Sequence, residues 1–367
     1  MPEAPLFVMI GGFLGAGKTT TVGRLAAMFR AQGKNVAIVT NDQATDLVDT
    51  NLLRSQGFEV GEVAGSCFCC NFNELTDTMQ RLSKDRLPDV ILAEPVGSCT
   101  DLVATVLRPL QQIYDVPFQL APFGVIVKHS HGQRILSGGK RRGFSPQAEY
   151  IFLKQLEEAD FLIVNRADQL TDQQMSELEK LIDNQFPERQ ILRVSALTGE
   201  GFDDLFQLLQ HDPQAGRRAI EVDYDVYAEG EAELGWLNCQ IKLTAASPFE
   251  LDEFLQAILG TLSQQLADAD AETAHLKAIG MWEGAYAVAN LISSDDEPTL
   301  SLSSGYSTQE ANVVVNARVA VAPESLTEVV RQSVAQVAAP LGIQADITSL
   351  QSFRPGRPVP THRITNS

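Results

Sequence analysis

The segment LFVMIGGFLGAGKTT, residues 6–20, decides how the rest of the chain is interpreted. Residues 6–11 are mostly apolar and predict a short buried strand, and residues 18–32 have the pattern of an amphipathic helix. Between them, residues 12–19 match the spacing GxxxxGK[ST], which is that of a phosphate-binding P-loop. The alternative is a tight glycine-rich turn without a ligand. The combined match of spacing, lysine, threonine and flanking periodicity favours the phosphate site.

Each residue type in this loop has a physical reason to contact a nucleotide. The glycines let the backbone wrap so that its N–H groups converge on phosphate oxygens, and the following helix adds positive charge at its N-terminus. We expect Lys18 to reach the β- and γ-phosphates and the Thr19 hydroxyl to bind Mg²⁺. The predicted phosphate-binding residues are Gly12, Gly15, Ala16, Gly17, Lys18, Thr19 and Thr20.

Length and composition limit the number of domains and the kinds of partner that the chain can have. With 367 residues, 44% of them hydrophobic and 20% charged, the chain should form two domains or one large domain with additions. A net charge of −19 argues against nucleic acid or an anionic membrane as a partner. The sequence contains no run of 18 apolar residues, and its N-terminus enters the first strand directly, so we expect neither a membrane span nor a secretory signal.

Three of the five cysteines, Cys67, Cys69 and Cys70, lie within four positions. This spacing does not resemble a disulfide framework and favours a reducing compartment, so we expect a cytoplasmic protein. Three thiols this close suit Zn²⁺, Cu(I) or Co²⁺, and an open fourth position would suit an ion that must leave again. The next cysteine is Cys99. The alternative is a group of buried thiols that pack as small hydrophobic side chains.

Polar residues also follow other predicted strands. Residues 88–94 form an apolar strand that ends in Glu94, and Gly97 could approach a γ-phosphate because ligands lie beyond the carboxyl ends of such strands. After the strand 34–40, the segment 41–53 has the position of a switch loop. This segment carries three carboxylates, which belong to Asp42, Asp46 and Asp49. They are either metal ligands or solvated loop charges, and their spacing favours neither interpretation. His129 and His131 follow a fourth strand and are either a metal pair or ordinary surface histidines.

A guanine-binding site is predicted after the strand 161–164. The residues Asn165-Arg-Ala-Asp168 are close to the pattern NKxD, and the Asp168 carboxylate can accept hydrogen bonds from N1–H and the 2-amino group of guanine. Adenine has no such donor pair, so the carboxylate would select GTP. The loop that starts with Ser195 and Ala196 resembles the SA-containing loop that supports guanine O6 through a backbone N–H. The alternative is an ATP-dependent kinase or ligase on the same scaffold.

Changes in pattern divide the chain. We expect an α/β P-loop NTPase domain with a mostly parallel sheet at residues 1–212 and an acidic linker at 213–234. Residues 235–351 alternate strands and helices approximately as β-α-β-β-α-β with one extra strand, which predicts a smaller α+β ferredoxin-like domain. The Pro-rich tail, 352–367, is expected to be disordered.

The first half of the chain resembles the CobW family of P-loop GTPases, which is related to the urease and hydrogenase nickel-insertion GTPases. The resemblance covers most of residues 5–210 and rests on GFLGAGKTT at 12–20, on the CxCC cluster at 67–70, on the turn from Glu94 to Gly97, and on the NRAD and SALTG segments. It implies that Asp42 occupies the position of a family glutamate and that Asp49 contacts Mg²⁺. It also implies that the three clustered cysteines bind metal and that Glu94 lies near the γ-phosphate.

The same resemblance implies a GTP-hydrolysing metallochaperone. Its catalytic residues would be Lys18, Glu94 and Asp49, with Mg²⁺ on Thr19 and Asp49 and with Zn²⁺ or Co²⁺ on the cysteines. The implied partners are GTP, a transition-metal ion and a client metalloprotein, and a nucleotide-dependent homodimer is a candidate assembly. A regulatory G-protein that serves a cofactor-dependent enzyme, with structural cysteines, is the alternative. The sequence departs from the family pattern at Pro95-Val96 and Lys128-His129, and it has no His-rich tract.

Overall fold

A computed structural model describes residues 4–41, 48–84, 86–114, 118–138, 145–187, 189–211, 218–291 and 297–365. The chain forms two compact units. Unit 1 comprises Met1–Gln43, Gly57–Gly230 and Arg357–Ser367, and unit 2 comprises Ala44–Gln56 and Glu231–Gly356. Asp42 and Asp46 lie outside the described residues.

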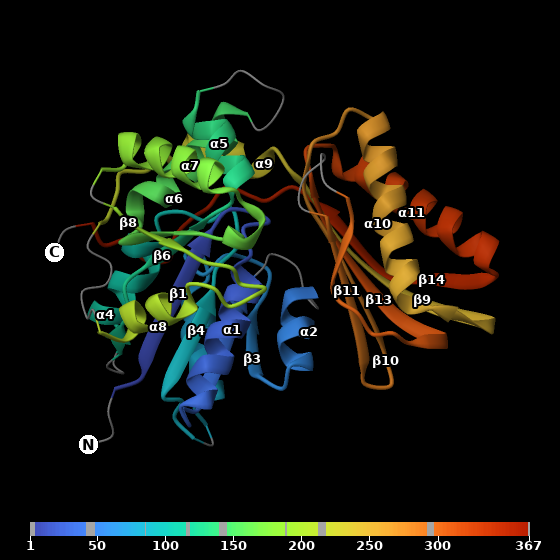
Figure 1. The fold of residues 1–367 in the computed structure, drawn as a ribbon, viewed down its shortest axis with the longest axis horizontal. Helices are drawn as coiled ribbons and strands as arrows, with labels where there is room; N and C mark the ends of the chain where they lie inside the picture. Colours follow the sequence, from blue (N-terminus) through green and yellow to red (C-terminus); the bar gives the residue numbers. More distant parts are fainter. Residues whose placement is uncertain are drawn as a thin grey trace. The chain divides into compact units, whose positions relative to one another are not determined.

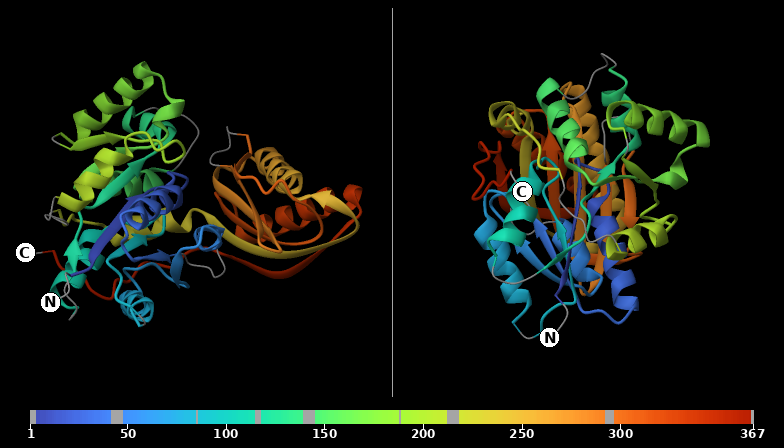
Figure 2. Two further views of the ribbon diagram at one scale, coloured as in Figure 1. Left: turned by 60° about the horizontal axis from the view of Figure 1, so that its bottom comes forward. Right: turned by 90° about the vertical axis from the view of Figure 1, so that its left-hand side faces the viewer.

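Unit 1 is built on a parallel sheet in the order β3-β2-β4-β1-β6-β7-β8, with β5 also paired to β1. Helices lie on both sides of this sheet (Figure 2). The strands are β1 (Leu6–Gly12), β2 (Val36–Asn41), β3 (Glu59–Val63), β4 (Val90–Glu94), β5 (Gln119–Leu120), β6 (Gly124–Val127), β7 (Phe161–Val164) and β8 (Gln190–Arg193). The helices are α1 (Lys18–Ala31), α3 (Phe72–Leu82), α4 (Arg108–Gln112), α5 (His129–Leu136), α6 (Pro146–Glu158), α7 (Asp172–Gln185), α8 (Phe202–His211) and α9 (Tyr224–Ala232).

The central strands of unit 1 are almost continuous apolar runs because both faces of the sheet are covered. In β1, every residue from Phe7 to Gly12 is buried. β1 pairs in parallel with β4, where Met9 faces Ala93, and with β6, where Ile10 faces Gly124. The carboxyl ends of these strands therefore meet at one edge of the sheet, which is where the predicted phosphate-binding residues lie.

Unit 2 contains an antiparallel sheet in the order β12-β11-β10-β13-β9-β14. The strands β9, β10, β13 and β14 with the helices α10 and α11 have the predicted β-α-β-β-α-β order, and β11 and β12 extend the sheet beyond β10. The elements are β9 (Gly235–Glu250), α10 (Leu251–Asp268), β10 (Thr273–Trp282), β11 (Ala285–Leu291), β12 (Thr299–Leu302), β13 (Ser307–Val319), α11 (Pro323–Ala338) and β14 (Ile343–Phe353).

The two faces of the unit 2 sheet are covered by different parts of the chain. α10 and α11 pack on one face and form the main core, as Figure 1 shows. The opposite face is covered by α2 (Val48–Ser55), whose Val48 and Leu52 are one helical turn apart and pack against Val288 and Val314. The segment that the sequence places in the P-loop domain thus belongs to unit 2.

The end of the chain also differs from the expectation of a disordered tail. β14 continues to Phe353, and residues 357–365 form hydrogen bonds within unit 1. The physical reason is that Arg363 binds the carboxylate of Asp101, which is fully buried. None of the helices in the described part of the chain has the length and hydropathy needed to span a bilayer.

Candidate functional site

The P-loop connects β1 to α1. Gly12, Gly15 and Gly17 have φ values of 142°, 70° and 98°, a region of the backbone map that favours glycine. At Gly17 a Cβ atom would lie 2.3 Å from Asn165 Nδ2, so a side chain there would also collide with the predicted base-binding segment. The turn that these glycines allow ends at the N-terminus of α1, whose partial positive charge suits an anion.

Lys18 and Thr19 are both buried at the start of α1. The Lys18 ammonium donates to the carbonyl oxygen of Gly12 at 2.9 Å, so it lies folded over the loop. The Thr19 hydroxyl donates to Glu94 Oε1 at 2.8 Å, which joins the P-loop to the end of β4. Thr20, by contrast, is exposed. The predicted catalytic residues Lys18 and Glu94 and the hydroxyl expected to bind Mg²⁺ are therefore close together, and a hydroxyl and a carboxylate are the oxygen donors that Mg²⁺ prefers.

Gly97 lies directly against the P-loop. A Cβ atom at this position would be 3.0 Å from Lys18 Nζ and 2.8 Å from Leu14 Cδ2, so any larger residue would occupy the space beside the lysine. Gln155 of α6 holds the segment in place, because its Nε2 donates to the carbonyl oxygens of Gly97 at 3.0 Å and Cys99 at 2.8 Å. Gln155 is buried and was not identified from the sequence, where an isolated glutamine in a helix carries no signal.

The predicted base-binding residues meet at the ends of β7 and β8. Asn165 Nδ2 donates to Ala16 O at 3.0 Å, and Asn165 Oδ1 accepts from the N–H of Ala196 at 3.0 Å. This one side chain therefore connects the P-loop to the loop after β8. Asp168 is exposed, so its carboxylate is accessible to a base.

The loop after β8 is itself held in place. Ser195 is fully buried, and its Oγ accepts from the N–H of Thr198 at 3.0 Å. Arg24 of α1 donates to Ala196 O at 2.8 Å and to Leu197 O at 2.6 Å. The structure thus brings Asn165, Ser195 and Ala196 together with the P-loop, while their contact with guanine stays a prediction.

The three clustered cysteines converge on one point. The Sγ–Sγ distances are 2.9 Å for Cys67 and Cys69, 3.2 Å for Cys67 and Cys70, and 3.6 Å for Cys69 and Cys70. Three thiolates on one zinc ion lie about 3.8 Å apart, given Zn–S bonds of about 2.3 Å in tetrahedral geometry. The cluster therefore needs to open by less than 1 Å, roughly, to accept such an ion.

The environment of Cys69 and Cys70 keeps these two thiols protonated without a metal. Hydrogen bonds with Cys67 and Cys70, together with burial, raise the pKa of Cys69 well above its ordinary value. A hydrogen bond with Cys67 raises the pKa of Cys70 to about 11. The Cys69 thiol also hydrogen-bonds with that of Cys99, so the cysteine that follows in the sequence does lie beside the cluster. A bound cation would replace these protons.

Asn41, the last residue of β2, shapes the cysteine loop. Its Nδ2 donates to Val63 O at 2.9 Å and to Ser66 O at 2.8 Å, and its Oδ1 accepts from the N–H of Phe68 at 2.8 Å. The sequence indicates only that Asn41 begins a candidate switch segment. The structure adds that its buried amide fixes the loop on which the thiols lie.

Three further candidates lie elsewhere. Asp49 is in α2, where its carboxylate forms an ion pair with Lys277 of unit 2, so its contact with Mg²⁺ stays a prediction. His131 is buried, and its ring packs edge-on against Phe13 at 5.6 Å between centroids. Within the described residues, neither His129 nor His131 joins the group of potential metal ligands formed by the cysteines.

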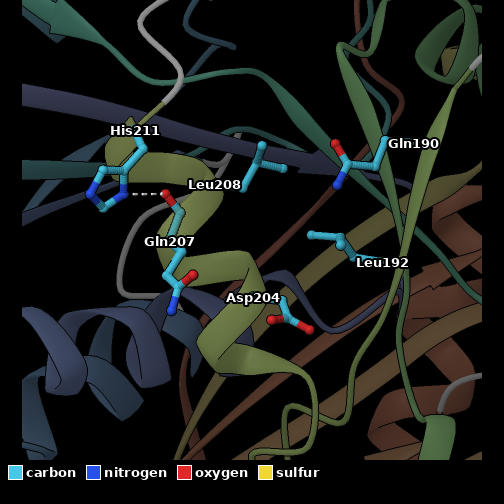
Figure 3. Close-up of a pocket in the computed structure, with 6 residues that line it drawn as sticks. All are labelled: Gln190, Leu192, Asp204, Gln207, Leu208 and His211. Carbon is cyan, nitrogen blue, oxygen red and sulfur yellow. Dashed lines mark hydrogen bonds between the residues drawn. The ribbon is translucent and has the colours of Figure 1, made fainter.

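A pocket on unit 1 lies away from these residues. Figure 3 shows it between β8 and α8, where His211 Nδ1 lies 2.9 Å from Gln207 O. Its lining residues are Gln190, Leu192, Asp204, Gln207, Leu208 and His211. None of them belongs to the P-loop, the base-binding segments or the cysteine cluster.

The first half of the chain is similar to known proteins. Residues 6–193 match the family model described as CobW/HypB/UreG, nucleotide-binding domain. The zinc chaperone YeiR of Escherichia coli is 27% identical over 191 residues, which cover 50% of this chain and 53% of YeiR. The zinc-regulated GTPase metalloprotein activator 1 of Dictyostelium discoideum is 21% identical over 213 residues, or 50% of this chain and 44% of that protein.

The chain thus spans about half the length of these curated relatives. Among solved structures, that of HypB from Helicobacter pylori in complex with nickel covers 57% of this chain and 87% of its own. Its sequence identity is 16% and its TM-score is 0.42.

Proposed function

Because this chain belongs to the CobW/HypB/UreG family of nucleotide-binding domains, we propose that it is a GTP-hydrolysing metallochaperone. In this proposal, Cys67, Cys69 and Cys70 carry a transition-metal ion of the zinc or cobalt class. The nucleotide state decides how firmly the ion is held, and a client metalloprotein receives it. Free thiols of this kind suit a reducing compartment, so we place the protein in the cytoplasm.

The observation that carries this proposal is the course of residues 94–101, which we call the linking segment. At its start, Glu94 accepts a hydrogen bond from Thr19 of the P-loop. Gly97 then lies against Lys18, and two residues later the Cys99 thiol contacts Cys69 of the cluster. A single short segment therefore touches both the phosphate site and the thiols, so a change at one end can alter the other.

Hydrolysis in this site depends on positioning and on charge neutralisation. A water molecule attacks the γ-phosphorus of GTP, and the bond from that phosphorus to the β–γ bridging oxygen breaks. The Lys18 ammonium and the backbone N–H groups of the P-loop stabilise the negative charge on the phosphate oxygens. Thr19 and Asp49 are the proposed ligands for Mg²⁺, which would supply further positive charge when bound. We propose that the Asp168 carboxylate restricts the substrate to guanine nucleotides.

Metal release follows from the same contacts. With GTP bound, the γ-phosphate lies near Lys18 and Gly97 and orders the linking segment. After hydrolysis and loss of phosphate, Gly97 loses its partner, the segment relaxes, and the sulfur atoms separate. Thiolate affinity then depends on the nucleotide, which is the property that a metal carrier requires.

The test is metal retention in two nucleotide states. The purified chain is loaded with Zn²⁺ under reducing conditions, and its affinity is measured by competition with a chromogenic chelator in the presence of a non-hydrolysable GTP analogue or GDP. We expect about one Zn²⁺ per chain and an affinity at least tenfold higher with the analogue, which corresponds to about 1.4 kcal/mol of coupling.

A matched variant isolates the role of the thiols. The Cys67→Ser/Cys69→Ser/Cys70→Ser variant should lose stoichiometric Zn²⁺ while it still binds GTP, because the P-loop is unchanged. The single variant Cys239→Ser is the control, since Cys239 is a buried thiol of the unit 2 core. If the triple variant retained Zn²⁺ like the unmodified chain, the assignment of these cysteines would be wrong.

A further inference from the structure

The C-terminal segment of unit 1, residues 357–365, lies over the cysteine cluster, and we call it the strap. The N–H of Val359 donates to the sulfur of Cys70 at 3.2 Å. Two residues later, the N–H of Thr361 donates to Cys69 O at 2.8 Å, and the Thr361 hydroxyl donates to Cys70 O at 3.0 Å. The strap therefore contacts two of the three cysteines through directed hydrogen bonds.

One buried ion pair fixes the strap. Arg363 Nε donates to Asp101 Oδ2 at 2.7 Å, and the side chain of Asp101 has no exposed surface. The Tyr224 hydroxyl donates to the same oxygen at 2.6 Å, and Arg363 also donates to Ile220 O at 2.9 Å. A buried carboxylate without a cation would be costly, so this pair ties the strap to a specific position.

Further contacts extend this attachment on both sides of Arg363. The N–H of Ile364 donates to Ala104 O at 2.8 Å, and Arg108 donates to Thr365 O at 2.6 Å. On the other side, the His362 ring packs edge-on against Phe72 at 5.2 Å between centroids. Because Phe72 follows the cysteines by two positions, the strap contacts the chain from Cys69 to the start of α3.

We propose that the strap is part of the metal site, and that the backbone N–H of Val359 is a positioning group for the Cys70 sulfur. This inference rests on the proposed function, because it assumes that Cys67, Cys69 and Cys70 hold the cargo ion. An N–H directed at a sulfur stabilises the thiolate that a metal requires and fixes its orientation. Among the three cysteines, Cys70 has the greatest need of a hydrogen bond that fixes its sulfur. Cys67 and Cys69 are buried and held by their surroundings, whereas Cys70 is partly exposed.

The anchor of the strap also connects it to the nucleotide site. Asp101 is the last residue of the linking segment, which begins at Glu94 beside the P-loop and passes Gly97 and Cys99. Movement of that segment would displace both the cluster and the carboxylate that holds Arg363. A client would then reach the ion on the side from which the strap withdraws.

The test removes the backbone N–H of residue 359 and changes little else in the strap. In Val359→Pro the residue has no N–H, so the bond to Cys70 Sγ is lost. Val359 is 69% exposed, so its side chain contributes little packing. Val359→Ala keeps the N–H and is the matched control. We expect Val359→Pro to weaken Zn²⁺ binding about tenfold, the lower end of the effect of removing an outer partner of a metal ligand. Val359→Ala should bind Zn²⁺ like the unmodified chain.

Two further readouts report on the sulfur itself. With Co²⁺ in place of Zn²⁺, the sulfur-to-cobalt charge-transfer band should shift in Val359→Pro and stay unchanged in Val359→Ala. In the metal-free chain, Arg363→Ala should release the strap and increase the rate at which Cys70 reacts with an alkylating agent. Arg357→Ala is the control, since Arg357 pairs with Asp225 at an exposed position of the same strap.

The outcomes separate this inference from the function on which it rests. If the unmodified chain and the triple cysteine variant bound Zn²⁺ equally, the proposed function would fail and the strap would have no metal to position. If the unmodified chain bound Zn²⁺ through its cysteines while Val359→Pro and Val359→Ala matched it in affinity and spectrum, the strap proposal alone would be overturned.

Discussion

The carboxylate of Asp49 in α2 forms an ion pair with the ammonium group of Lys277 in β10. Both side chains are partly buried, with 26% of Asp49 and 14% of Lys277 exposed. α2 also packs its apolar face on the same sheet through Val48 and Leu52. The carboxylate that the family resemblance assigns to Mg²⁺ is therefore paired with a lysine of the same unit in this structure.

We therefore predict that Lys277 competes with Mg²⁺ for Asp49. In Lys277→Gln, the Asp49 carboxylate can bind Mg²⁺ without first breaking its ion pair with the lysine. The Mg²⁺ concentration that gives half-maximal GTP hydrolysis should therefore fall. A partly buried pair worth about 1 kcal/mol corresponds to a change of about fivefold. Asp49→Asn should raise that concentration. The measurement is steady-state phosphate release at varied Mg²⁺ and saturating GTP.

Lys242→Gln provides the control, because it removes a positive charge from an exposed position of β9 in the same sheet. It should leave the Mg²⁺ dependence unchanged. A higher Mg²⁺ requirement in Lys277→Gln would show that the lysine supports the active arrangement, and the idea of competition would be discarded.

Base selection gives a second prediction. Asp168 is exposed beside the loop that Asn165 holds, and its carboxylate is the proposed acceptor for two donors of guanine. Asp168→Asn replaces one acceptor by a donor, so GTP affinity should fall at least about a hundredfold, since bonds to charged groups are worth about 1.5–3 kcal/mol each. Xanthosine triphosphate, which carries an oxygen in place of the 2-amino group, should bind better than GTP.

Competition between fluorescent and unlabelled nucleotides measures this change. Gln169→Ala, at the neighbouring exposed position, is the matched control and should keep the preference for guanine. Equal loss of ATP and GTP binding in Asp168→Asn would indicate a damaged loop instead of a lost base contact.

The linking segment supports a third prediction. Gln155 Nε2 donates to the carbonyl oxygens of Gly97 and Cys99, which lie on either side of Ser98. Gln155→Met has similar volume and no donor, so GTP and Zn²⁺ should each still bind. The ratio of Zn²⁺ affinities with the GTP analogue and with GDP should fall toward one, because the two ends of the segment are no longer held together. An unchanged ratio would assign the coupling to another path.

Much of unit 1 could be predicted because its signals are local. The P-loop combines a buried strand, three glycines and a helix within 26 residues, and β1 and α1 lie where the pattern places them. The strand 161–164 was predicted with its bounds, since four buried apolar residues end at a polar turn. The shared edge of the parallel strands then brings Glu94 to Thr19 without further information.

What could not be predicted depends on contacts distant in sequence. β3 (Glu59–Val63) contains two glutamates and a glycine, which hides its strand character, and its position comes from pairing with β2. The place of α2 depends on Ile279, Val288 and Val314, more than 200 residues away in the sheet of unit 2. The strap has few apolar residues, and its order depends on Asp101. Composition suggests disorder for such a segment because it carries no information about a buried partner.

The buried carboxyl group of Glu158 gives a fourth prediction. Thr100 Oγ1 and the N–H of Val103 lie 3.1 Å and 3.2 Å from its two oxygens, and burial raises the pKa of Glu158 from 4.5 to about 8. Between these pH values the folded chain holds a proton that the unfolded chain releases. The free energy of unfolding must therefore fall as the pH rises through this window, by up to about 1.4 kcal/mol for each pH unit.

Glu158→Gln tests this sign, because the amide is an uncharged isostere that can accept from Val103 N–H and donate to Thr100. The difference in melting temperature between Glu158→Gln and the unmodified chain should be small near pH 5 and should grow in favour of the variant up to about pH 8. Other titrating groups are common to both proteins and cancel in the difference. Glu157 provides the control, because its side chain is 45% exposed and pairs with Lys154. The difference in melting temperature between Glu157→Gln and the unmodified chain should not grow in this way. If the melting temperatures of Glu158→Gln and the unmodified chain differed by a constant amount across this pH range, Glu158 would already be ionised in the folded chain. The hydrogen bonds from Thr100 and Val103 would then outweigh the cost of burial.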